Sequence, residues 1–209
     1  MHRPSNITPS NMKSVAIVLI IFIIQGFANQ VNEVRPPYTN HAARARYMVH
    51  MADWAMLGTI STQSAYQGRP FLNPISICDG TLDNSTGVPY MYASPLDVSM
   101  QDVTENNQIT LSLSEAELNI DDCHLTKHSD PENPLCSRLV MFGTMEQVSD
   151  ATELEFVKKA MFSRHPIMAS WPEDHKFTFM KMQLTDLWMI DFFGGGVTID
   201  IKDYFKAKP

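Results

Sequence analysis

The chain has 209 residues, which fits one ordinary domain or one domain with an appendage, and 44% of them are hydrophobic. That composition can bury a core and excludes a chain that is disordered throughout. The formal net charge is −7 with no Lys/Arg-rich run, which argues against nucleic-acid binding because neutralising phosphates requires a basic face.

The first 28 residues have the layout of a secretory signal peptide. Basic residues precede an uninterrupted apolar run, Val15–Ile24, and small residues stand at positions −3 and −1 of a cleavage site after Ala28. The alternative is an uncleaved anchor, but a run of about ten residues is well short of the roughly 20 that span a bilayer. The sequence therefore predicts a signal peptide over residues 1–28 and a mature protein in the secretory pathway.

Residues 29–40 contain Pro36-Pro37 and little periodicity, which predicts an extended N-terminal arm. A single domain is expected over residues 41–209. Its first element is a short amphipathic helix within His41–Asp53, which delivers Trp54 into the first strand. Apolar residues recur there at helical spacing: Ala45, Met48, Val49 and Ala52.

Three short segments rich in Ile, Thr, Tyr and Phe predict strands: Ala55–Thr62, Phe71–Cys78 and Val88–Ser94. The first two flank a well-marked turn, because Gly68 supplies a positive φ and Pro70 cannot donate to a central ladder. Strands this short, separated by turn signals, predict an antiparallel meander that the rest of the chain completes and covers.

The middle of the chain alternates between polar connections and strands. Pro95–Asn107 is polar and acidic and predicts a crossing helix or turn. Apolar residues alternate strictly with Thr and Ser over Ile109–Ser114, which indicates a half-buried strand. Glu115–Leu135 is a long polar excursion, of the kind that tends to be functional in compact domains. Arg138–Val148 is a further strand candidate.

The last third begins with a helix, because Asp150 and Glu153 fit a capping box and apolar residues mark one face as far as Arg164. Phe177–Asp191 is the longest strand candidate and is apolar on both faces, so a helix or a second subunit is expected to cover its outer face. Ile199–Phe205 predicts a terminal strand or short helix. The predicted fold class is mainly β with α: a small antiparallel barrel of about six strands with a few helices around one core.

The three cysteines allow two interpretations. In a secreted chain, Cys123 and Cys136 bracket the long loop and are well placed to form a disulfide, which leaves Cys78 as a buried free thiol. The alternative is a zinc site in which His124 and His128 join Cys123 and Cys136. Its spacing matches no common zinc module, and an oxidising compartment favours the disulfide. No metal is therefore expected.

Asn84-Ser85-Thr86 is an N-glycosylation sequon in a loop-like stretch. Because the chain carries a signal peptide, we expect Asn84 to be glycosylated.

No catalytic constellation stands out. The best polar cluster, Arg164-His165-Pro166, is expected to cap a helix C-terminus, where cations are favoured, and then to stop the helix. His41 and His50 are expected on a helix face. The sequence has no Gly-x-Ser-x-Gly, His-Glu-x-x-His or P-loop motif, and Gly194–Gly196 lacks the context of a dinucleotide fingerprint. No catalytic residue is therefore predicted.

An ordered series of motifs runs through the mature chain: His41-Ala-Ala-Arg44, Asp53-Trp54, Thr59-Ile60-Ser61-Thr62, Gly68-Arg69-Pro70-Phe71, Gly87-Val88-Pro89-Tyr90, Ser94-Pro95-Leu96, Cys136, Gly143-Thr144, Phe162-Ser-Arg164-His165-Pro166, Trp171-Pro172 and Asp191-Phe192-Phe193-Gly194-Gly195. The chain thereby resembles the CREG family of secreted glycoproteins over about residues 40–205. The resemblance implies a split barrel like that of the FMN-dependent pyridoxine phosphate oxidases, packed as a homodimer. It also implies a secreted or endosomal–lysosomal glycoprotein, linked to growth restraint and differentiation, whose flavin pocket is vestigial.

The residues bear on the flavin pocket independently. Flavin-binding relatives hold the FMN phosphate with Lys or Arg after the third strand, whereas Ser94–Asn107 has neither and carries Asp97, Asp102 and Glu105. Carboxylates repel a phosphate, so we expect no cofactor and no FMN enzyme activity. Three arginines elsewhere in the chain remain available to a phosphate: Arg44, Arg46 and Arg69.

Three functional hypotheses follow, in order of preference. The first is a non-enzymatic secreted or lysosomal homodimer that recognises protein partners, a lysosomal sorting receptor among them, through the loop Ile120–Leu135 and the Asn84 glycan. Its candidate contact residues are Lys127, His128 and Asp130. The second is an FMN-dependent oxidoreductase. The third is a pH-responsive lysosomal factor that titrates its imidazoles: His50, His124, His128, His165 and His175.

Overall fold

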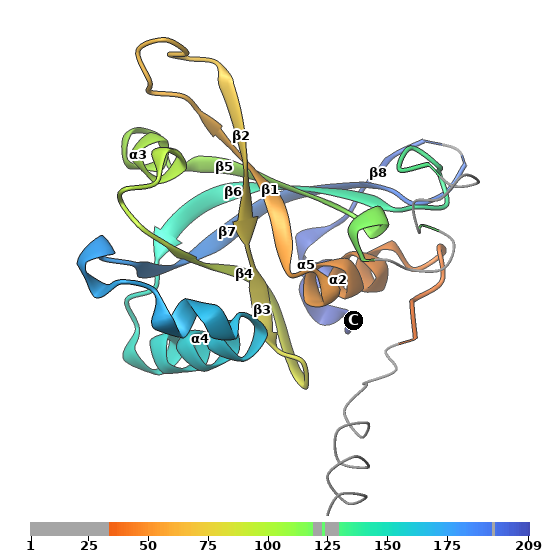
Figure 1. Ribbon diagram of the computed structural model, residues 1–209. Coiled ribbons are helices and arrows are strands. Elements are labelled where there is room, and N and C mark those ends of the chain that lie inside the picture. Colours follow the sequence, from red (N-terminus) through yellow and green to blue (C-terminus); the bar gives the residue numbers. More distant parts are fainter. Residues whose placement is uncertain (1–33, 119–122, 124–129, 194) are drawn as a thin grey trace, which may run out of the picture. The chain divides into compact units, whose positions relative to one another are not determined.

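The computed structural model describes residues 34–118, 123, 130–193 and 195–209 (Figure 1). The predicted signal peptide with its cleavage after Ala28 lies outside the described residues, as do Lys127, His128 and the His124 of the zinc alternative. The described part of the predicted arm, up to Asn40, contains a turn but no helix or strand.

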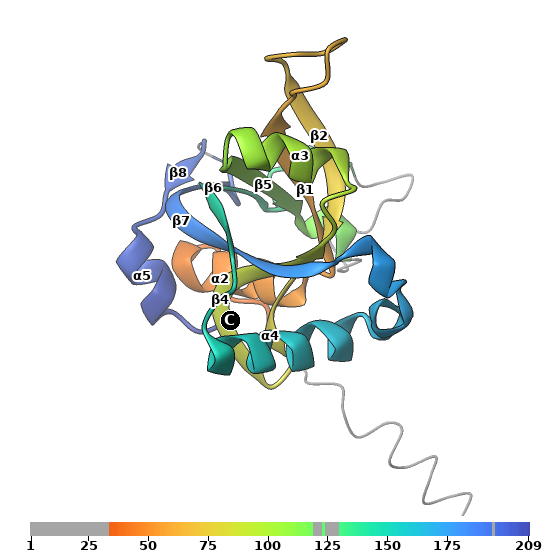
Figure 2. The ribbon, with the colours of Figure 1, turned by 90° about the vertical axis from the view of Figure 1, so that its left-hand side faces the viewer.

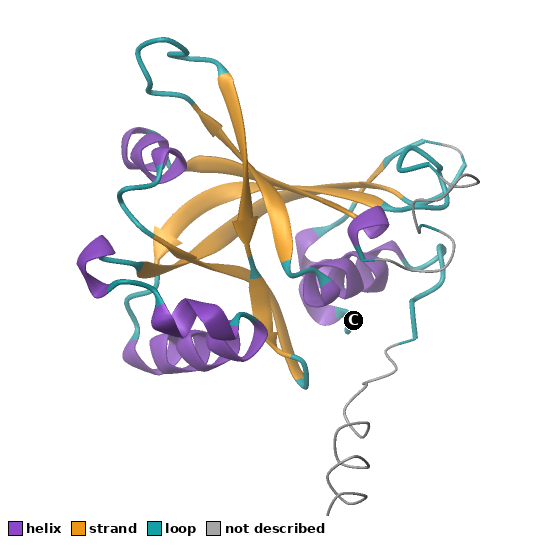
Figure 3. Cartoon of the chain, in the orientation of Figure 1, coloured by secondary structure: helices purple, strands orange, loops and turns teal. Residues whose placement is uncertain are grey.

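Antiparallel strands form the centre of this part of the chain, and helices lie at its periphery (Figure 3). The α-helices are α2 (His41–Met51), α3 (Val98–Glu105), α4 (Ala151–Arg164) and α5 (Ile201–Lys206). The strands are β1 (Trp54–Ile60), β2 (Pro70–Ser76), β3 (Cys78–Thr81), β4 (Asn84–Ala93), β5 (Gln108–Ser114), β6 (Arg138–Gln147), β7 (Thr178–Ile190) and β8 (Val197–Thr198).

The strands pair in the order β2-β1-β5-β6-β7-β4-β3, with β8 on β7, and every pairing is antiparallel. The first and last strands of that order, β2 and β3, are neighbours along the chain with only Ile77 between them. One chain segment therefore connects the two ends of the hydrogen-bonded order and curls the sheet into a half-barrel (Figure 1).

The corner at Ile77 is fixed by hydrogen bonds from two sides. Its N–H donates to the carbonyl of Asp53 (3.0 Å), and its carbonyl lies 2.9 Å from Nε2 of His165, just beyond α4. The corner therefore ties β1, the β2–β3 bend and the end of α4 together.

The predicted meander is only partly right. β1 and β2 form the expected hairpin, in register from Trp54–Ser76 to Ile60–Pro70. The expected third strand does not continue it, because β4 pairs with β3 and β7 at the other end of the order. Turn signals define which neighbours in sequence form a hairpin, but they carry no information about partners that arrive later in the chain.

Prolines inside β2 agree with its place at the edge of the sheet. Pro70 and Pro74 lie in the strand itself rather than only in the preceding turn. Because proline has no N–H to donate, a strand that contains it is tolerated where one side has no partner strand.

Elsewhere the local signals predict the elements well. The helix expected within His41–Asp53 is α2, and the period-two segment is β5. Asp150 caps α4, since its carboxylate accepts a hydrogen bond from the N–H of Glu153 at 2.8 Å. The C-terminal segment, predicted as strand or helix, is the helix α5, capped by Asp200.

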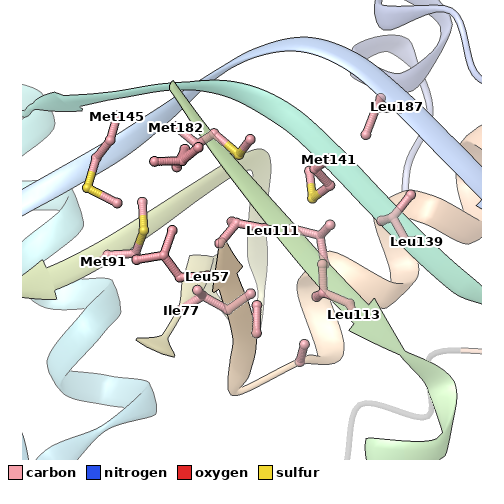
Figure 4. Close-up of a cluster of buried hydrophobic side chains, with 14 of the residues drawn as sticks. Leu57, Ile77, Met91, Leu111, Leu113, Leu139, Met141, Met145, Met182 and Leu187 are labelled. Carbon is pink, nitrogen blue, oxygen red and sulfur yellow. The ribbon is translucent and has the colours of Figure 1, made fainter. Parts of the chain in front are cut away.

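The main core fills the concave side of the curled sheet (Figure 4). Leucines, isoleucines and valines from most strands contribute, together with many methionines: Met48, Met91, Met100, Met141, Met145, Met180, Met182 and Met189. Methionine is unbranched and flexible, so it fills the irregular interior that a strongly curved sheet leaves.

A second, smaller apolar cluster lies between α4 and the sheet, where α4 packs beside β3 and β4 (Figures 1 and 2). Cys78 belongs to it as a buried free thiol. Burial raises the pKa of Cys78 to about 12, so the thiol stays protonated and behaves as a small hydrophobe.

Arg164 caps a helix C-terminus, but not that of its own helix. Its guanidinium donates to the carbonyls of His50 (2.8 Å) and Ala52 (3.2 Å), at the end of α2, and to the carboxylate of Asp53 (2.9 Å). The expectation for this cluster is therefore right for His165, which is the C-cap residue of α4, and wrong for Arg164, whose guanidinium caps α2. Within the described ranges, no helix is long and apolar enough to cross a membrane.

Candidate functional site

A cavity of about 570 Å³ opens beside α3, where β2 and β4 approach each other without pairing. We call it the α3 cavity. Its walls come from β1, β2, the end of β4, the start of α3 and the segment before β7: Leu57, Asn73, Pro74, Ile75, Ser76, Tyr92, Ala93, Ser94, Leu96, Asp97, Ser99, Met100, Met168, Trp171, Pro172, His175 and Phe177. Its volume is in the range of small-molecule sites.

One wall of the α3 cavity is aromatic. The ring of Tyr92 stacks with Phe177 at a centroid distance of 5.0 Å and with Trp171 at 6.1 Å, and Trp171 lies 4.8 Å from Phe177. These residues come from the end of β4 and from the segment before β7. The wall is therefore preformed by packing.

The polar groups of the cavity already bond one another. The hydroxyl of Ser94 donates to the carbonyl of His175 (2.6 Å), and the amide of Asn73 lies 3.3 Å from the hydroxyl of Ser99. Asp97 is the N-cap of α3 and accepts a hydrogen bond from the N–H of Ser99 at 2.7 Å.

This donor set does not fit the phosphate of FMN. Helix N-termini attract anions, but a carboxylate, that of Asp97, already occupies the N-terminus of α3. No Lys or Arg is among the described residues that line the cavity, and His175 is the one side chain there that can become cationic. A phosphate placed here would lose its hydration and gain no Lys or Arg donor.

Two of the three arginines left open by the sequence are engaged elsewhere. Arg44 is buried and donates to Glu115 (2.9 Å) and to Ser137 (2.6 Å). Arg46 is buried too, and binds Ser85 and the carbonyl of Ala207. Neither they nor Arg69 line the α3 cavity, so none of the three supplies the missing cation.

The structure joins Cys123 to Cys136 by a disulfide, which closes the long loop. Beside it, the N-terminal arm is attached through Arg35, which donates to both oxygens of Glu115 and to the carbonyl of Leu135 (2.8 Å). Asp130, the one candidate contact residue of this loop within the described chain, is exposed.

The sequon lies at a hairpin rather than in an extended loop. Asn84 is exposed and pairs with Thr81 as the first residue of β4. Behind it, the buried carboxylate of Asp79 accepts hydrogen bonds from the Ser85 hydroxyl and from the N–H of Gly87 (3.0 Å). The side chain of Asn84 is therefore presented to solvent on a fixed hairpin.

Two histidines that the sequence placed on a helix face are bonded to carboxylates. Nδ1 of His50 lies 2.7 Å from Asp79, inside the fold. Nδ1 of His41 lies 2.8 Å from Asp191, and the side chain of His41 is 40% exposed. Sequence reasoning missed the second pair because its members are 150 residues apart. The signal available was that both occur in the motifs that carried the family resemblance.

Solved structures place the fold in a known class. The chain aligns with a heme binding protein from Mycobacterium smegmatis at a TM-score of 0.63 and 14% identity. That alignment covers 84% of this chain and 62% of the other, which is less than two thirds of its length. It aligns with a Clostridium acetobutylicum protein of the pyridoxinephosphate oxidase family at a TM-score of 0.51 and 13% identity. That alignment covers 78% of this chain and 96% of the other. The fold is a split barrel of the pyridoxine-phosphate-oxidase type, as the resemblance implied.

Sequence comparison then defines the family. A family model described as "CREG, beta-barrel" matches residues 36–206. The chain is 39% identical to Protein CREG1 of Homo sapiens, over 82% of this chain and 76% of that protein. It is 38% identical to Protein CREG1 of Gallus gallus, over 83% of this chain and 90% of that protein. It is also 39% identical to Protein CREG2 of Mus musculus, over 85% and 60%. The chain belongs to the CREG family, which confirms the resemblance; these relatives are not named as enzymes.

Proposed function

We propose that this protein is a non-enzymatic, secreted or endolysosomal glycoprotein that acts as a homodimer through protein partners, in growth restraint, differentiation or lysosomal function. Family membership supports the general role, and the disulfide supports an oxidising compartment. The vestigial character of the flavin pocket is part of the same proposal.

One observation carries the non-enzymatic assignment: the N-cap carboxylate of Asp97 stands at the anion-attracting end of α3, beside a cavity without Lys or Arg among its described walls. In a split barrel, that combination removes the electrostatic basis for holding FMN. The runner-up is an FMN-dependent oxidoreductase, which the fold class alone favours.

Two features support action through partners. The disulfide-closed loop that contains Lys127, His128 and Asp130 is anchored at its base by the Arg35–Glu115 contacts, so a contact surface there would be held on a rigid support. The exposed Asn84 provides a glycan site on a separate hairpin.

The outer face of the sheet supports the homodimer. Leu72, which is 63% exposed, lies directly across from Gly58, and Gly58 from Thr110. Thr110 lies across from Phe142, which is 40% exposed. Residues that pair across an antiparallel sheet share a face, so these four residues form one largely apolar row, in which Thr110 contributes a hydroxyl. Ile60 and Trp188 extend the exposed apolar surface, and large patches of this kind mark interfaces.

A flavin titration tests the proposal most directly. Purified glycosylated protein is titrated with FMN and, in parallel, with riboflavin, which lacks the phosphate; calorimetry and flavin fluorescence report binding. We expect no saturable FMN binding up to about 100 µM, which corresponds to a binding free energy weaker than about −5.5 kcal/mol. Saturable FMN binding with turnover of a reductant would establish the oxidoreductase instead.

The loop is tested by charge reversal. Asp130→Lys and Lys127→Glu should weaken binding of the labelled protein to responsive cells while leaving the melting temperature unchanged, because Asp130 is exposed and the hydrogen bond its carboxylate accepts from the N–H of Glu132 is exposed too. Glu173→Lys, an exposed charge reversal far along the chain, is the control. Equal loss of binding and stability would show that the loop is merely structural.

A further inference from the structure

A second cavity, of about 530 Å³, lies where the N-terminal arm meets the end of β7. We call it the His41 pocket. Residues from the arm, the start of α2 and the β7–β8 connection line it: Pro37, Tyr38, Thr39, His41, Asp191, Phe192, Phe193, Gly195 and Val197. It shares no lining residue with the α3 cavity, and its volume suits a small organic molecule.

Its apolar wall is a cluster of aromatic rings in tilted and edge-to-face contact. Phe192 and Phe193 are 48% and 66% exposed, and their rings meet edge to face at a centroid distance of 5.5 Å. The Tyr38 ring lies 5.3 Å from Phe192, with the guanidinium of the buried Arg44 4.0 Å from its centroid. Exposed aromatic rings held in place in this way mark a binding surface rather than ordinary surface scatter.

Tyr38 is fixed from a third direction. Its hydroxyl donates to the carbonyl of Leu135 at 3.1 Å, next to the disulfide-bonded Cys136. The carbonyl of Leu135 therefore accepts hydrogen bonds from both Arg35 and Tyr38, so it holds the arm and the pocket wall together.

His41 supplies the pocket with a hydrogen-bond acceptor. Asp191 is nearly fully buried and its carboxylate can only accept, so Nδ1 of His41 carries the shared hydrogen. In the neutral ring this leaves a lone pair on Nε2. No described residue hydrogen-bonds Nε2, and the ring is 40% exposed at the pocket.

The surrounding charges disfavour an anion. Among the described residues that line the pocket there is no Lys or Arg, and Asp191 contributes a carboxylate. An adjoining cavity of about 540 Å³ shares Thr39 and His41 and adds Asp200 and Asp203, with Lys206 3.7 Å from Asp203. Arg35 and Arg44, the cations beside the Tyr38 ring, are both paired with Glu115. A ligand with a carboxylate or phosphate would therefore meet more negative than positive charge here.

From these contacts we infer that the His41 pocket binds an uncharged aromatic small molecule whose hydroxyl group donates a hydrogen bond to Nε2 of His41. Its rings pack against Phe192 and Phe193. The inference goes beyond partner binding and does not depend on the flavin argument, since the two cavities have no residue in common.

2-Naphthol is a suitable probe, because it has two fused rings and one hydroxyl, and its fluorescence responds when the hydroxyl meets a base. Titration at neutral pH is compared with naphthalene, which lacks the donor, and with 2-naphthoate, which is anionic. We expect saturable 2-naphthol binding, about tenfold weaker binding of naphthalene and still weaker binding of 2-naphthoate.

The aromatic wall is tested with Phe193→Ser, which should weaken 2-naphthol and naphthalene alike by about fivefold. Ile167→Ser is the matched control, since Ile167 is 69% exposed and lines neither the His41 pocket, nor the adjoining cavity, nor the α3 cavity. Equal binding by Phe193→Ser and the unmodified protein would overturn the inference, as would the absence of saturable binding.

The acceptor is tested with Asp191→Asn. The amide of asparagine can donate to Nδ1 of His41, which moves the ring hydrogen to Nε2 and turns the acceptor into a donor. The affinity for 2-naphthol should then fall toward that for naphthalene, because an aromatic hydroxyl donates a hydrogen bond well but accepts one poorly. The affinity for naphthalene itself should stay unchanged. Loss of both affinities by the same factor, or of neither, would show that Nε2 is not the contact. Because Phe193 is exposed, the Phe193→Ser measurement still tests the inference even if Asp191→Asn fails to fold.

Discussion

Two glutamates two residues apart have opposite electrostatic environments. Burial penalises the charge of Glu115, but a hydrogen bond from Arg35, one from the N–H of Ser137 and the charge of Arg44 outweigh that penalty and lower its pKa below the usual 4.5. Among the described residues, no cation lowers the pKa of Glu117 in this way. Burial raises the pKa of Glu117 to about 7, and its Oε1 has no hydrogen-bond partner within the described residues.

These shifts predict opposite effects of removing the charge. For Glu117 the folded pKa is raised, so its ionisation destabilises the fold as pH rises from 4.5 to about 7. Glu117→Gln should therefore increase the free energy of unfolding by about 1–2 kcal/mol at about pH 8 and change little below about pH 4.5. Urea unfolding across this range measures it; stabilisation confined to acid would contradict the assignment.

Glu115→Gln should behave in the opposite way. The lowered folded pKa of Glu115 contributes stability above 4.5, and this contribution is lost as pH falls through the folded value. The substitution leaves the buried Arg44 without its carboxylate, so we expect a loss of about 3–5 kcal/mol near neutral pH that shrinks in acid. A loss that does not depend on pH would indicate a packing defect instead.

At the scale of elements, helices and strands are joined by side chains that cap their neighbours. Arg164 at the end of α4 binds the last carbonyls of α2, and His165 lies beside the carbonyl of Ile77 at the β2–β3 corner. Three elements separated in sequence therefore share one junction. This junction stabilises the bend that curls the sheet.

Arg164→Gln should lower the free energy of unfolding by about 2 kcal/mol, because two carbonyls at the end of α2 and the Asp53 carboxylate lose a charged donor. Lys158→Gln, which removes an exposed cation from the same helix, should change it by less than about 0.5 kcal/mol. Chemical denaturation of both variants gives the comparison. Similar small effects would mean that the junction adds no stability.

At the scale of the whole domain, the exposed apolar row on the outer face predicts how copies associate. Phe142→Arg and Leu72→Arg place charges in this row without entering the core, since both side chains are exposed. We expect each to convert the proposed homodimer to a monomer in sedimentation velocity at micromolar concentration, with the melting temperature of the monomer little changed. Ile167→Arg, at an exposed site outside this row, should leave the proposed homodimer intact. A dimer unaffected by both substitutions would place the interface elsewhere.

The sequence by itself determined most of the elements. Helical spacing gave α2, strict alternation gave β5, and Asp150 marked the start of α4, because caps and periodicities act within a few residues. The carboxylates of Ser94–Asn107 and its lack of Lys and Arg also argued against an FMN phosphate, but only the structure places Asp97 at the start of α3 beside a cavity. The motif series was sufficient to identify the family.

Only the tertiary structure decided the sheet order and the pairs of distant side chains. No local signal shows that β2 and β3 lie at opposite ends of the order, or that β4 pairs with β7. The same holds for His41 with Asp191 and Arg44 with Glu115, which are 150 and 71 residues apart. Such contacts form when the curled sheet brings remote segments together, and a cavity exists only where those segments meet without filling the space.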